Sequence, residues 1–276
     1  MKKSFKETCV ELRKKDHTLN EIMAITGRSK TSIYAHIRSI PLSIKKREQI
    51  AENSRRLALG LSSSRLGVAL RPFRPFEEWT AETVLLTAHL MFDGRLAKSC
   101  EYNNRSLILI GRVKKLMTVV YDFPPKSYLN QVTGVMRISY HNVAMANFFK
   151  RKAMELLGSV EILPADLQRE FLRAFFDDEG CMYYKITRNK RQIRGYQNEV
   201  TVLKIVSQLL ANMNIKSNLR GRNEVLISGK ENLMKFRDEI NFSKGVRINP
   251  NRTNSLWKKN LEKRKLLDMA IASFKK

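Results

Sequence analysis

An internal repeat constrains the fold of this chain more than any other feature of its sequence. One copy reads EYNNRSLILIGRVKKLMTVVYDFPPKSYLNQVTGVMRISYHNVAMANFF, and the other reads GYQNEVTVLKIVSQLLANMNIKSNLRGRNEVLISGKENLMKFRDEI. Each begins with a Tyr-x-Asn strand and continues with an amphipathic helix, a basic polar strand, a turn, an apolar strand and a second helix. The alternative is chance similarity between two generic α+β segments, and the shared order of elements argues against it.

An apolar helix that ends in an acidic residue and glycine precedes each copy. The sequences are LLTAHLMFDG before the first copy and FLRAFFDDEG before the second. Each half is therefore predicted to be α-β-β-α-β-β-α, and two such halves should pack as a pseudo-dimer within one α+β chain. The expected oligomeric state is a monomer.

The two repeats are assigned to residues 79–160 and 161–276, and two further segments precede them. Residues 1–40 are predicted to form three short helices of a small all-α domain. Residues 41–78 begin as a basic helix, LSIKKREQIAENSRRLAL, and then change to GLSSSRLG and RPFRPFEEW, a composition typical of a linker.

The charge of the chain limits its partners. It carries 52 Lys and Arg residues against 26 acidic residues, a formal net charge of +26 at pH 7. A polyphosphate usually supplies the counter-charge, although a membrane surface or an acidic protein could also do so. No apolar run approaches the roughly 20 residues of a membrane span. The start MKKSFKETCV lacks a signal peptide's apolar region, and three cysteines at no metal-ligand spacing are typical of a reducing compartment. We expect a cytoplasmic, nucleoid-associated protein.

The first 40 residues have the pattern of a helix-turn-helix. Thr18 and Glu21 form a capping box that starts a helix, Gly27 ends it, and Ser29 caps the next helix, KTSIYAHIRSI. The residues expected to close a small core against FKETCVELRKK are Ile22, Ile25, Ile33 and Ile37.

The second of these helices is the candidate recognition helix. Its outward residues, which would reach base edges or phosphates in a major groove, are Lys30, Thr31, Tyr34 and Arg38. A plain three-helix bundle used for protein contacts is the alternative, and the net charge favours double-stranded DNA. The basic run Lys45, Lys46, Arg47, Arg55 and Arg56 either follows a phosphate backbone or is a solvated helix face.

The two acid-ended helices indicate a metal site. Ala88 and Ala174 are small residues that would let the helices pack closely side by side. Their C-terminal ends would then bring Asp93 and Glu179 together. Because a helix C-terminus repels anions, two carboxylates there are costly unless a cation joins them, and Mg²⁺ is the usual partner of such oxygen ligands.

The two acid-ended helices resemble the motifs of the LAGLIDADG homing endonucleases. LTAHLMFDG (86–94) and LRAFFDDEG (172–180) look like the two motifs of a single-chain member, and ISGKENLMKFRDEINFSKG (227–245) looks like the distal part of that fold. The resemblance implies a saddle of two four-stranded sheets in the DNA major groove. It also implies that Asp93 and Glu179 are the metal ligands and catalytic acids, with basic residues, here Lys244 and Lys150, near the active sites.

The strand segments favour the same docking surface. The basic residues in and around the strands of the second repeat are Lys185, Arg188, Lys190, Arg191, Arg194, Arg220 and Arg222, with Tyr183 and Tyr184 interleaved. Alternation would place one strand face on the helices and the other on phosphates and base edges. A solvated strand face usually carries both signs of charge, whereas residues 185–194 contain no acid.

The first repeat departs from the family pattern. Nine positions separate Asp93 from Tyr102 and seventeen separate Glu179 from Tyr196, so the first hairpin is predicted to be shorter by eight residues. Met91 occupies the motif's first acidic position, where the second repeat has Asp177, a residue interpreted as structural. His89 inside the first helix is interpreted as a satisfied core residue.

Three functions remain in competition. The leading hypothesis is a magnesium-dependent, site-specific double-strand DNA endonuclease whose helix-turn-helix extends the recognised site. The second is a sequence-specific DNA-binding regulator, similar to sporulation regulators whose LAGLIDADG-like core has lost its catalytic acids. An RNA-splicing role is the third, and an intein is not expected because no terminal His-Asn pair is present.

Overall fold

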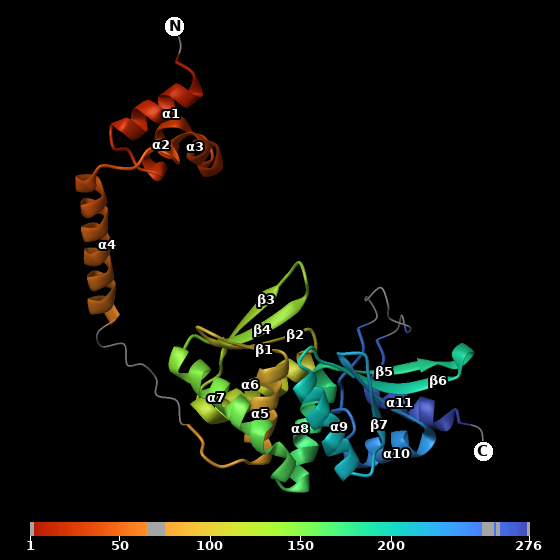
Figure 1. Ribbon diagram of the computed structural model, residues 1–276. Helices are drawn as coiled ribbons and strands as arrows, with labels where there is room; N and C mark the ends of the chain where they lie inside the picture. The colour runs from red at the N-terminus through yellow and green to blue at the C-terminus, as the bar shows by residue number, and fades with distance from the viewer. Residues whose placement is uncertain (1–2, 66–74, 250–256, 258–259, 275–276) are drawn as a thin grey trace. The chain divides into compact units, whose positions relative to one another are not determined.

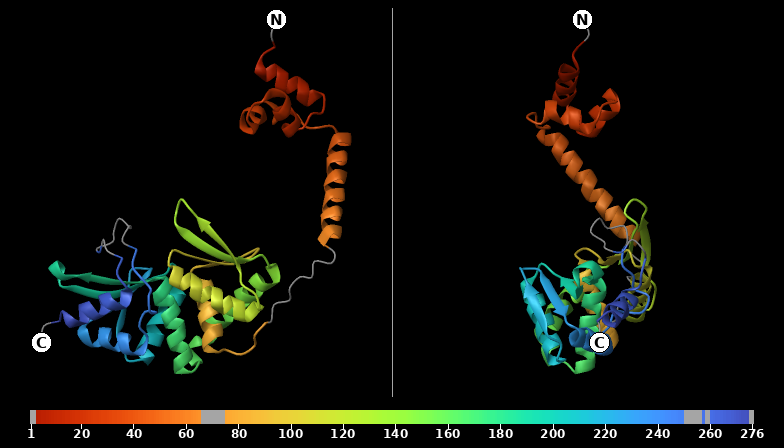
Figure 2. Two further views of the ribbon diagram at one scale, coloured as in Figure 1. Left: turned by 180° about the vertical axis from the view of Figure 1, so that it is seen from behind. Right: turned by 90° about the vertical axis from the view of Figure 1, so that its right-hand side faces the viewer.

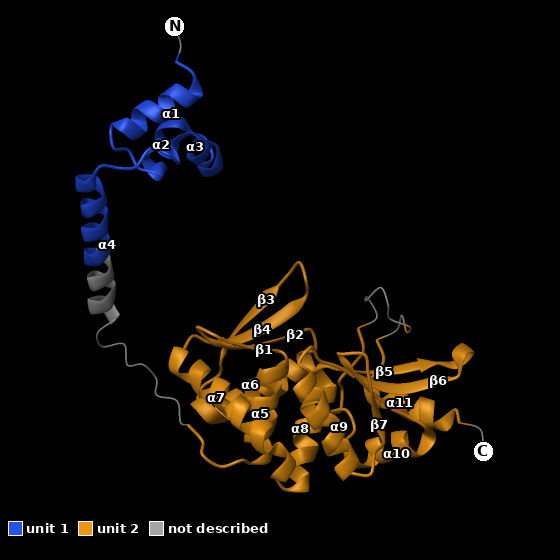
Figure 3. Ribbon diagram, in the orientation of Figure 1, with its two compact units in different colours: residues 1–71 blue, residues 72–276 orange. Residues whose placement is uncertain are grey.

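The computed structural model describes residues 3–65, 75–249, 257 and 260–274, with residues 57–65 described by their backbone alone. It divides into two compact units, which we call unit 1 (residues 1–71) and unit 2 (residues 72–276) (Figure 3).

The described part of unit 1 contains four helices: α1 (Phe5–Lys14), α2 (Leu19–Thr26), α3 (Lys30–Ile37) and α4 (Ile44–Arg65). The predicted capping box is present at α2, where the Thr18 hydroxyl accepts from the Glu21 backbone and the Glu21 carboxylate accepts from the Thr18 backbone. Gly27 ends α2 with φ +66°, in the left-handed region that glycine adopts without strain.

Two details of unit 1 differ from the sequence prediction. Its core contains Cys9, Ile22, Ile33 and Ile37, but Ile25 lies outside this small cluster with 57% of its surface exposed. Helix α4 continues through GLSSSR, which was expected to be linker. Relative to alanine, a serine or a glycine destabilises a helix by about 1 kcal/mol or less. A helix that begins upstream can therefore continue through these residues.

Unit 2 contains the two predicted repeats in the predicted order of elements (Figure 1). The first repeat is α5 (Ala81–Phe92), β1 (Gly94–Leu96), β2 (Cys100–Asn104), α6 (Leu107–Tyr121), β3 (Lys126–Asn130), β4 (Val135–Tyr140) and α7 (Val143–Ser159). The second is α8 (Ala165–Asp178), β5 (Gly180–Lys185), β6 (Lys190–Tyr196), α9 (Val200–Asn212), β7 (Ser217–Arg220), β8 (Glu224–Ser228) and α10 (Lys230–Glu239), followed by α11 (Lys263–Ala272). The antiparallel sheets have the strand orders β1-β2-β4-β3 and β5-β6-β8-β7, which confirms the α+β prediction.

Helices α5 and α8 pack side by side at the centre of unit 2, with one sheet on each side of the pair (Figures 1 and 2). Ala88 and Ala174 are fully buried, as expected for helices in close contact. The ring of Phe92, at the end of α5, lies edge-on to Phe171 and Phe175 of α8 with centroids 5.7 and 5.3 Å away. We call the contact between α5 and α8 the seam.

The register of the two hairpins corrects the alignment of the repeats. The Asn103 backbone donates to the Asp93 carbonyl, and the Tyr196 backbone donates to the Glu179 carbonyl, so Asn103 and Tyr196 are equivalent. Tyr102 is therefore equivalent to Gly195, and the Tyr-x-Asn alignment is wrong by one residue. Ten positions separate the first equivalent pair and seventeen the second, so the first hairpin is shorter by seven residues.

Each sheet has one face on the helices and one face away from them. On β5 and β6 the buried side chains Met182, Tyr184 and Ile193 belong to the helix-side core. The other face, which we call the open face, alternates with it. The strand registers place on the open faces Arg95, Glu101, Asn103, Lys126, Tyr128, Arg137, Tyr183, Lys185, Lys190, Gln192, Arg194 and Arg220.

Candidate metal and nucleic-acid site

Asp93 and Glu179 occupy equivalent positions at the ends of the two seam helices. Each is the C-cap residue of its helix, and Gly94 or Gly180 follows as the first residue of a strand. A Cβ atom on either glycine would overlap the carbonyl of Leu90 or of Phe176 one turn earlier. Glycine therefore allows each chain to turn directly from helix into strand, which fixes the place of the acid before it.

The environment of Asp93 shows that carboxylates gather at the seam. Burial, together with the negative charges of Asp178 and Glu179, raises the pKa of Asp93 to about 7. A hydrogen bond from Asn104 Nδ2 to Asp93 Oδ2, at 2.7 Å, acts in the opposite direction. The negative charge of Glu179, the other predicted terminal acid, is thus near enough to disfavour the ionised form of Asp93.

Asp178 crosses the seam to the first repeat. Its Oδ2 lies 2.8 Å from His89 Nδ1 of α5, and its Oδ1 accepts a 2.7 Å hydrogen bond from the Tyr102 hydroxyl of β2. The side chains of Asp178 and His89 are both fully buried. Burial alone lowers the pKa of His89, but the Asp178 carboxylate outweighs burial and the net pKa is raised.

The two side chains that cross the seam differ in chemistry: the one from the first repeat is aromatic, and the one from the second repeat is a carboxylate. Phe92 of the first repeat and Asp178 of the second are equivalent, and each crosses to the opposite repeat. Phe92 meets Phe171 and Phe175, whereas Asp178 meets His89 and Tyr102. A pairing of two identical repeats would leave the carboxylate without these donors, so the seam favours contact between unlike repeats.

Asp177 has a structural environment. Its side chain is fully buried, its Oδ1 accepts from the Ser243 backbone at 2.8 Å, and its Oδ2 lies 3.8 Å from Arg112 Nη1 of α6. Arg112 belongs to the first repeat and Ser243 to the second, so this group also joins the two repeats.

Lys263 contacts the C-terminal end of α8, the helix that ends in Glu179. The sequence predicted no role for this lysine. From the start of α11 its ammonium donates to the carbonyls of Phe176, Asp177 and Gly180 at 3.1, 2.8 and 2.6 Å. Lys263 is 6% exposed, and burial lowers its pKa against the raising effect of Asp177 and other acids. Nothing in LEKRKLL distinguishes this lysine from its neighbours.

The two lysines predicted to lie near the acids have different surroundings. Lys244 is exposed in the turn after α10, next to Ser243, whose backbone donates to Asp177. Lys150 is exposed within α7. Their roles remain proposals.

The predicted basic DNA contacts lie in three settings. Lys185, Lys190, Arg194 and Arg220 belong to the open face of the second sheet, and Arg188 and Arg222 are exposed in the turns of its hairpins. Arg191 lies on the helix side instead, where it donates to Ser273 Oγ and to the Ser273 carbonyl at 2.6 and 2.8 Å. Strand alternation contained this signal, because Arg191 has the same parity as the core residue Ile193.

In unit 1 the four predicted contacts all lie on α3 or at its C-cap, and all are exposed. They are Lys30, Thr31, Tyr34 and Arg38. Their spacing places them along one side of the helix, next to the side that carries the buried Ile33 and Ile37.

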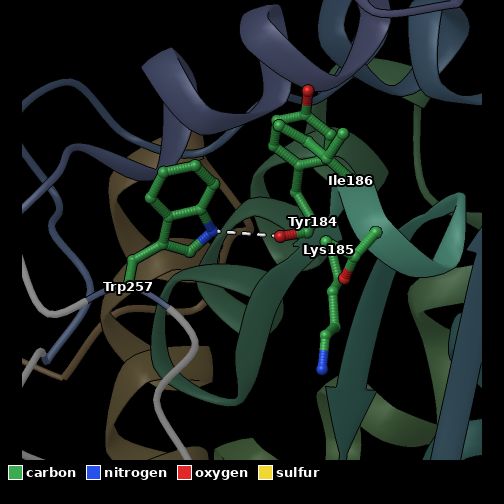
Figure 4. Close-up of a pocket in the computed structure, with 5 residues that line it drawn as sticks. Tyr184, Lys185, Ile186 and Trp257 are labelled. Atoms are coloured by element: carbon green, nitrogen blue, oxygen red, sulfur yellow. Dashed lines mark hydrogen bonds between the residues drawn. The ribbon is translucent and has the colours of Figure 1, made fainter.

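Trp257 covers the outer edge of β5 beside a cavity of about 310 Å³ (Figure 4). Its indole N–H donates to the Tyr184 carbonyl at 3.1 Å, and its ring stacks on Tyr184 with centroids 5.8 Å apart. The cavity is lined by Tyr184, Lys185, Ile186, Thr187 and Trp257, and so lies apart from the two terminal acids. Because β5 is an edge strand, this bond occupies a carbonyl otherwise open to pairing with another chain.

Replacing Trp257 by phenylalanine should lower the stability of unit 2 by about 1 kcal/mol, since the ring stays and one hydrogen bond is lost. Urea unfolding followed by the fluorescence of Trp79, the other tryptophan, measures this loss. Trp257→Leu, which also removes the stacking, should cost more. Equal stabilities of Trp257→Phe and the unmodified protein would show that the bond to Tyr184 contributes nothing.

The second repeat is similar to a known family. Residues 166–241, which include most of α8 with its acidic end, match the model of the LAGLIDADG-like domain. No curated protein matches the chain.

Several solved structures are similar to part of this chain. Mesophilic variants of the homing endonuclease I-DmoI have 18% identity and a TM-score of 0.46, covering 59% of this chain and 91% of theirs. The N-terminal LAGLIDADG domain of WhiA has 17% identity and a TM-score of 0.45, covering 61% and 88%. Full-length WhiA from Thermatoga maritima has 15% identity and a TM-score of 0.48, covering 72% and 63%.

Two further findings concern the residues that the structure describes. Within them, no helix is both long and apolar enough to cross a bilayer. Within the same residues, no group of three or more His, Cys, Asp or Glu side chains is arranged to hold a metal ion.

Proposed function

We propose that this protein is a site-specific double-strand DNA endonuclease that requires a divalent metal ion. The observation that carries the proposal is the equivalent position of Asp93 and Glu179, one from each repeat, at the C-terminal ends of two helices packed against each other. Each repeat has an acid at the last acidic position of its motif. This favours an active nuclease rather than a core that only binds DNA.

The residues at the seam fit a hard cation. The terminal acids offer only oxygen atoms, and burial together with the charges of Asp178 and Glu179 raises the pKa of Asp93. Both oxygens of Asp178 are already occupied by His89 and Tyr102, so Asp93 and Glu179 would hold the ion. Two carboxylates are few ligands, and Mg²⁺ is commonly completed by substrate phosphates and water.

Each repeat contributes to the chemistry through its own residues. Asn104 holds Asp93 Oδ2, and so fixes the direction of the other carboxylate oxygen. Lys263 fixes the last turn of α8, and thereby the backbone on either side of Glu179. A bound Mg²⁺ would supply activation of water and stabilisation of the leaving oxygen of a phosphodiester.

DNA binding by both units supports the same function. The net charge of +26 suits a phosphate backbone, and the open faces carry basic and aromatic side chains from both repeats. In unit 1 the exposed side of α3 would read a second stretch of the target. The internal pseudo-dimer would let a monomer contact both half-sites.

Cleavage of randomised duplex libraries with Mg²⁺ or Mn²⁺ tests the proposal. The protein should cut selected sequences, and an Asp93→Asn, Glu179→Gln variant should still bind them but leave both strands intact. Glu161→Gln removes an exposed acid that is distant along the chain from the C-terminal ends of the seam helices, and it is the matched control. Cutting that persists in the double variant would contradict the proposed site.

The second candidate is a DNA-binding regulator with a silent core. It is favoured by the helix-turn-helix pattern of unit 1, together with the pKa of about 7 for Asp93, which leaves part of this acid protonated at neutral pH in the metal-free protein. Selective binding of duplexes without nicking in either metal would support this function instead.

A further inference from the structure

Each open face carries one arginine that is held by a glutamate and a tyrosine. In the first sheet, Arg137 Nη1 lies 3.8 Å from Glu101 Oε2, and its guanidinium lies 4.8 Å from the centre of the Tyr128 ring. The second sheet has the same three residue types, an arginine, a glutamate and a tyrosine, around Arg194.

Arg194 is held even more closely. Its Nε lies 3.5 Å from Glu224 Oε1, and its guanidinium lies 4.0 Å from the centre of the Tyr183 ring. The Gln192 side-chain oxygen accepts from the same edge of the guanidinium, with Nη2 at 2.7 Å. One edge and one face of the Arg194 fork are therefore occupied, the Tyr196 side chain also interacts with the guanidinium, and 17% of the Arg194 side-chain surface stays exposed.

The two arrangements are related across the repeats. In each sheet the arginine and glutamate lie diagonally across the central strand pair: Arg137 is opposite Asn103 and Arg194 is opposite Leu226, with the glutamate two residues along the neighbouring strand. The strands are exchanged, because the arginine is on β4 in the first repeat and on β6 in the second. Two different sequences thus reach one arrangement.

Both arginines also lie close to the ends of the seam helices. Arg137 pairs with Asn103, whose backbone donates to the Asp93 carbonyl. Arg194 pairs with Cys181, two residues after Glu179. Each half of the protein therefore has one supported guanidinium near its terminal acid.

The support has a physical consequence for recognition. Glu101 and Glu224 are only 6% and 7% exposed, so each needs a cation beside it, whereas the arginine side chains remain 40% and 17% exposed. A guanidinium fixed in position loses little entropy when its free donors bind. A phosphate is bound well by a mobile lysine, but a base edge with two acceptors requires an oriented fork, and guanine offers that edge through O6 and N7.

We propose that Arg137 and Arg194 are the central base-reading residues and that each recognises one guanine, so the preferred target has a guanine in each half near its centre. The proposal rests on the DNA binding described under the proposed function, and it is independent of cleavage. Glu101, Tyr128, Glu224 and Tyr183 act as positioning residues for the two arginines.

Selection of bound duplexes from a randomised library, followed by sequencing, tests the proposal with the full chain. Arg137→Lys and Arg194→Lys keep the charge and remove the fork. Each should lose the preference for guanine at one position, about tenfold or more, while the affinity for unselected DNA and its dependence on salt stay within about twofold. Arg191→Lys, on the same strand as Arg194 but on its helix side, is the matched control and should leave the preferred sequence unchanged.

The outcomes separate this inference from the proposed function. An unchanged guanine preference in both lysine variants would overturn the inference while leaving DNA binding intact, and failure of the unmodified protein to bind any duplex would overturn both. Thermal unfolding shows whether each variant is folded. If either arginine variant is not, Tyr183→Leu or Tyr128→Leu provides the second test, because loss of the ring should weaken the same guanine preference.

Discussion

Replacement of Lys263 by methionine should destabilise unit 2 by about 2 to 4 kcal/mol. Methionine has a similar length, but it leaves the carbonyls of Phe176, Asp177 and Gly180 without the donors that the ammonium provides. A buried acceptor without a partner costs about 1 to 3 kcal/mol, and relief from burying the ammonium offsets part of the sum. The net loss is large because one side chain donates to three carbonyls, of which that of Phe176 also accepts from the Glu179 backbone.

Urea unfolding followed by tryptophan fluorescence measures this change in unit 2, since Trp79 and Trp257 both belong to it. Lys265→Met removes an exposed lysine two residues along the same helix and should change the stability little. A Lys263→Met protein as stable as Lys265→Met would show that the ammonium does not stabilise the end of α8.

Asp93→Asn should stabilise the metal-free protein at pH 8 by roughly 1 to 4 kcal/mol, because asparagine removes a charge that is unfavourable in the folded state. Burial, Asp178 and Glu179 raise the pKa of Asp93 to about 7, above the value of 3.8 for an ordinary aspartate. The folded protein therefore holds a proton that the unfolded chain releases at lower pH. The stabilisation from this proton is complete below about pH 4 and is lost as the pH rises to 7.

Urea unfolding in EDTA at pH 5 and pH 8 provides the measurement. The advantage of Asp93→Asn should be present at pH 8 and smaller at pH 5, whereas Glu161→Gln, at an exposed site, should show no such difference. Added Mg²⁺ should reverse the order at pH 8, since a bound cation favours the carboxylate. A variant less stable than the unmodified protein in EDTA at pH 8 would contradict the crowding of acids at the seam.

Much of the fold could be predicted from local sequence. The capping box at Thr18 and Glu21, the helix stop at Gly27 and the acid-glycine ends at Asp93 and Glu179 are all formed by residues within a few positions of each other. The order of elements in both repeats was predictable for the same reason, because the periods of helix and strand differ.

Strand register was harder to predict from the sequence than the order of the elements. The two Tyr-x-Asn sequences look equivalent, but the backbone bonds of Asn103 and Tyr196 show that Tyr102 aligns with Gly195. A shift of one residue changes the face on which a side chain lies. Tyr102 thus reaches Asp178 on the core side, while Tyr196 lies on the open face, and the similar sequences have different roles.

The sequence by itself determined the two repeats, the helix ends and the place of one acid at the end of a helix in each half, because these depend on spacing along the chain. Only the tertiary structure decided that Lys263 caps α8, that Arg191 caps α11, and that Asp178 bonds to His89 across the seam. Each of these contacts joins residues more than 80 positions apart. Their partners are set by how the helices and sheets pack, and local periodicity carries no information about that.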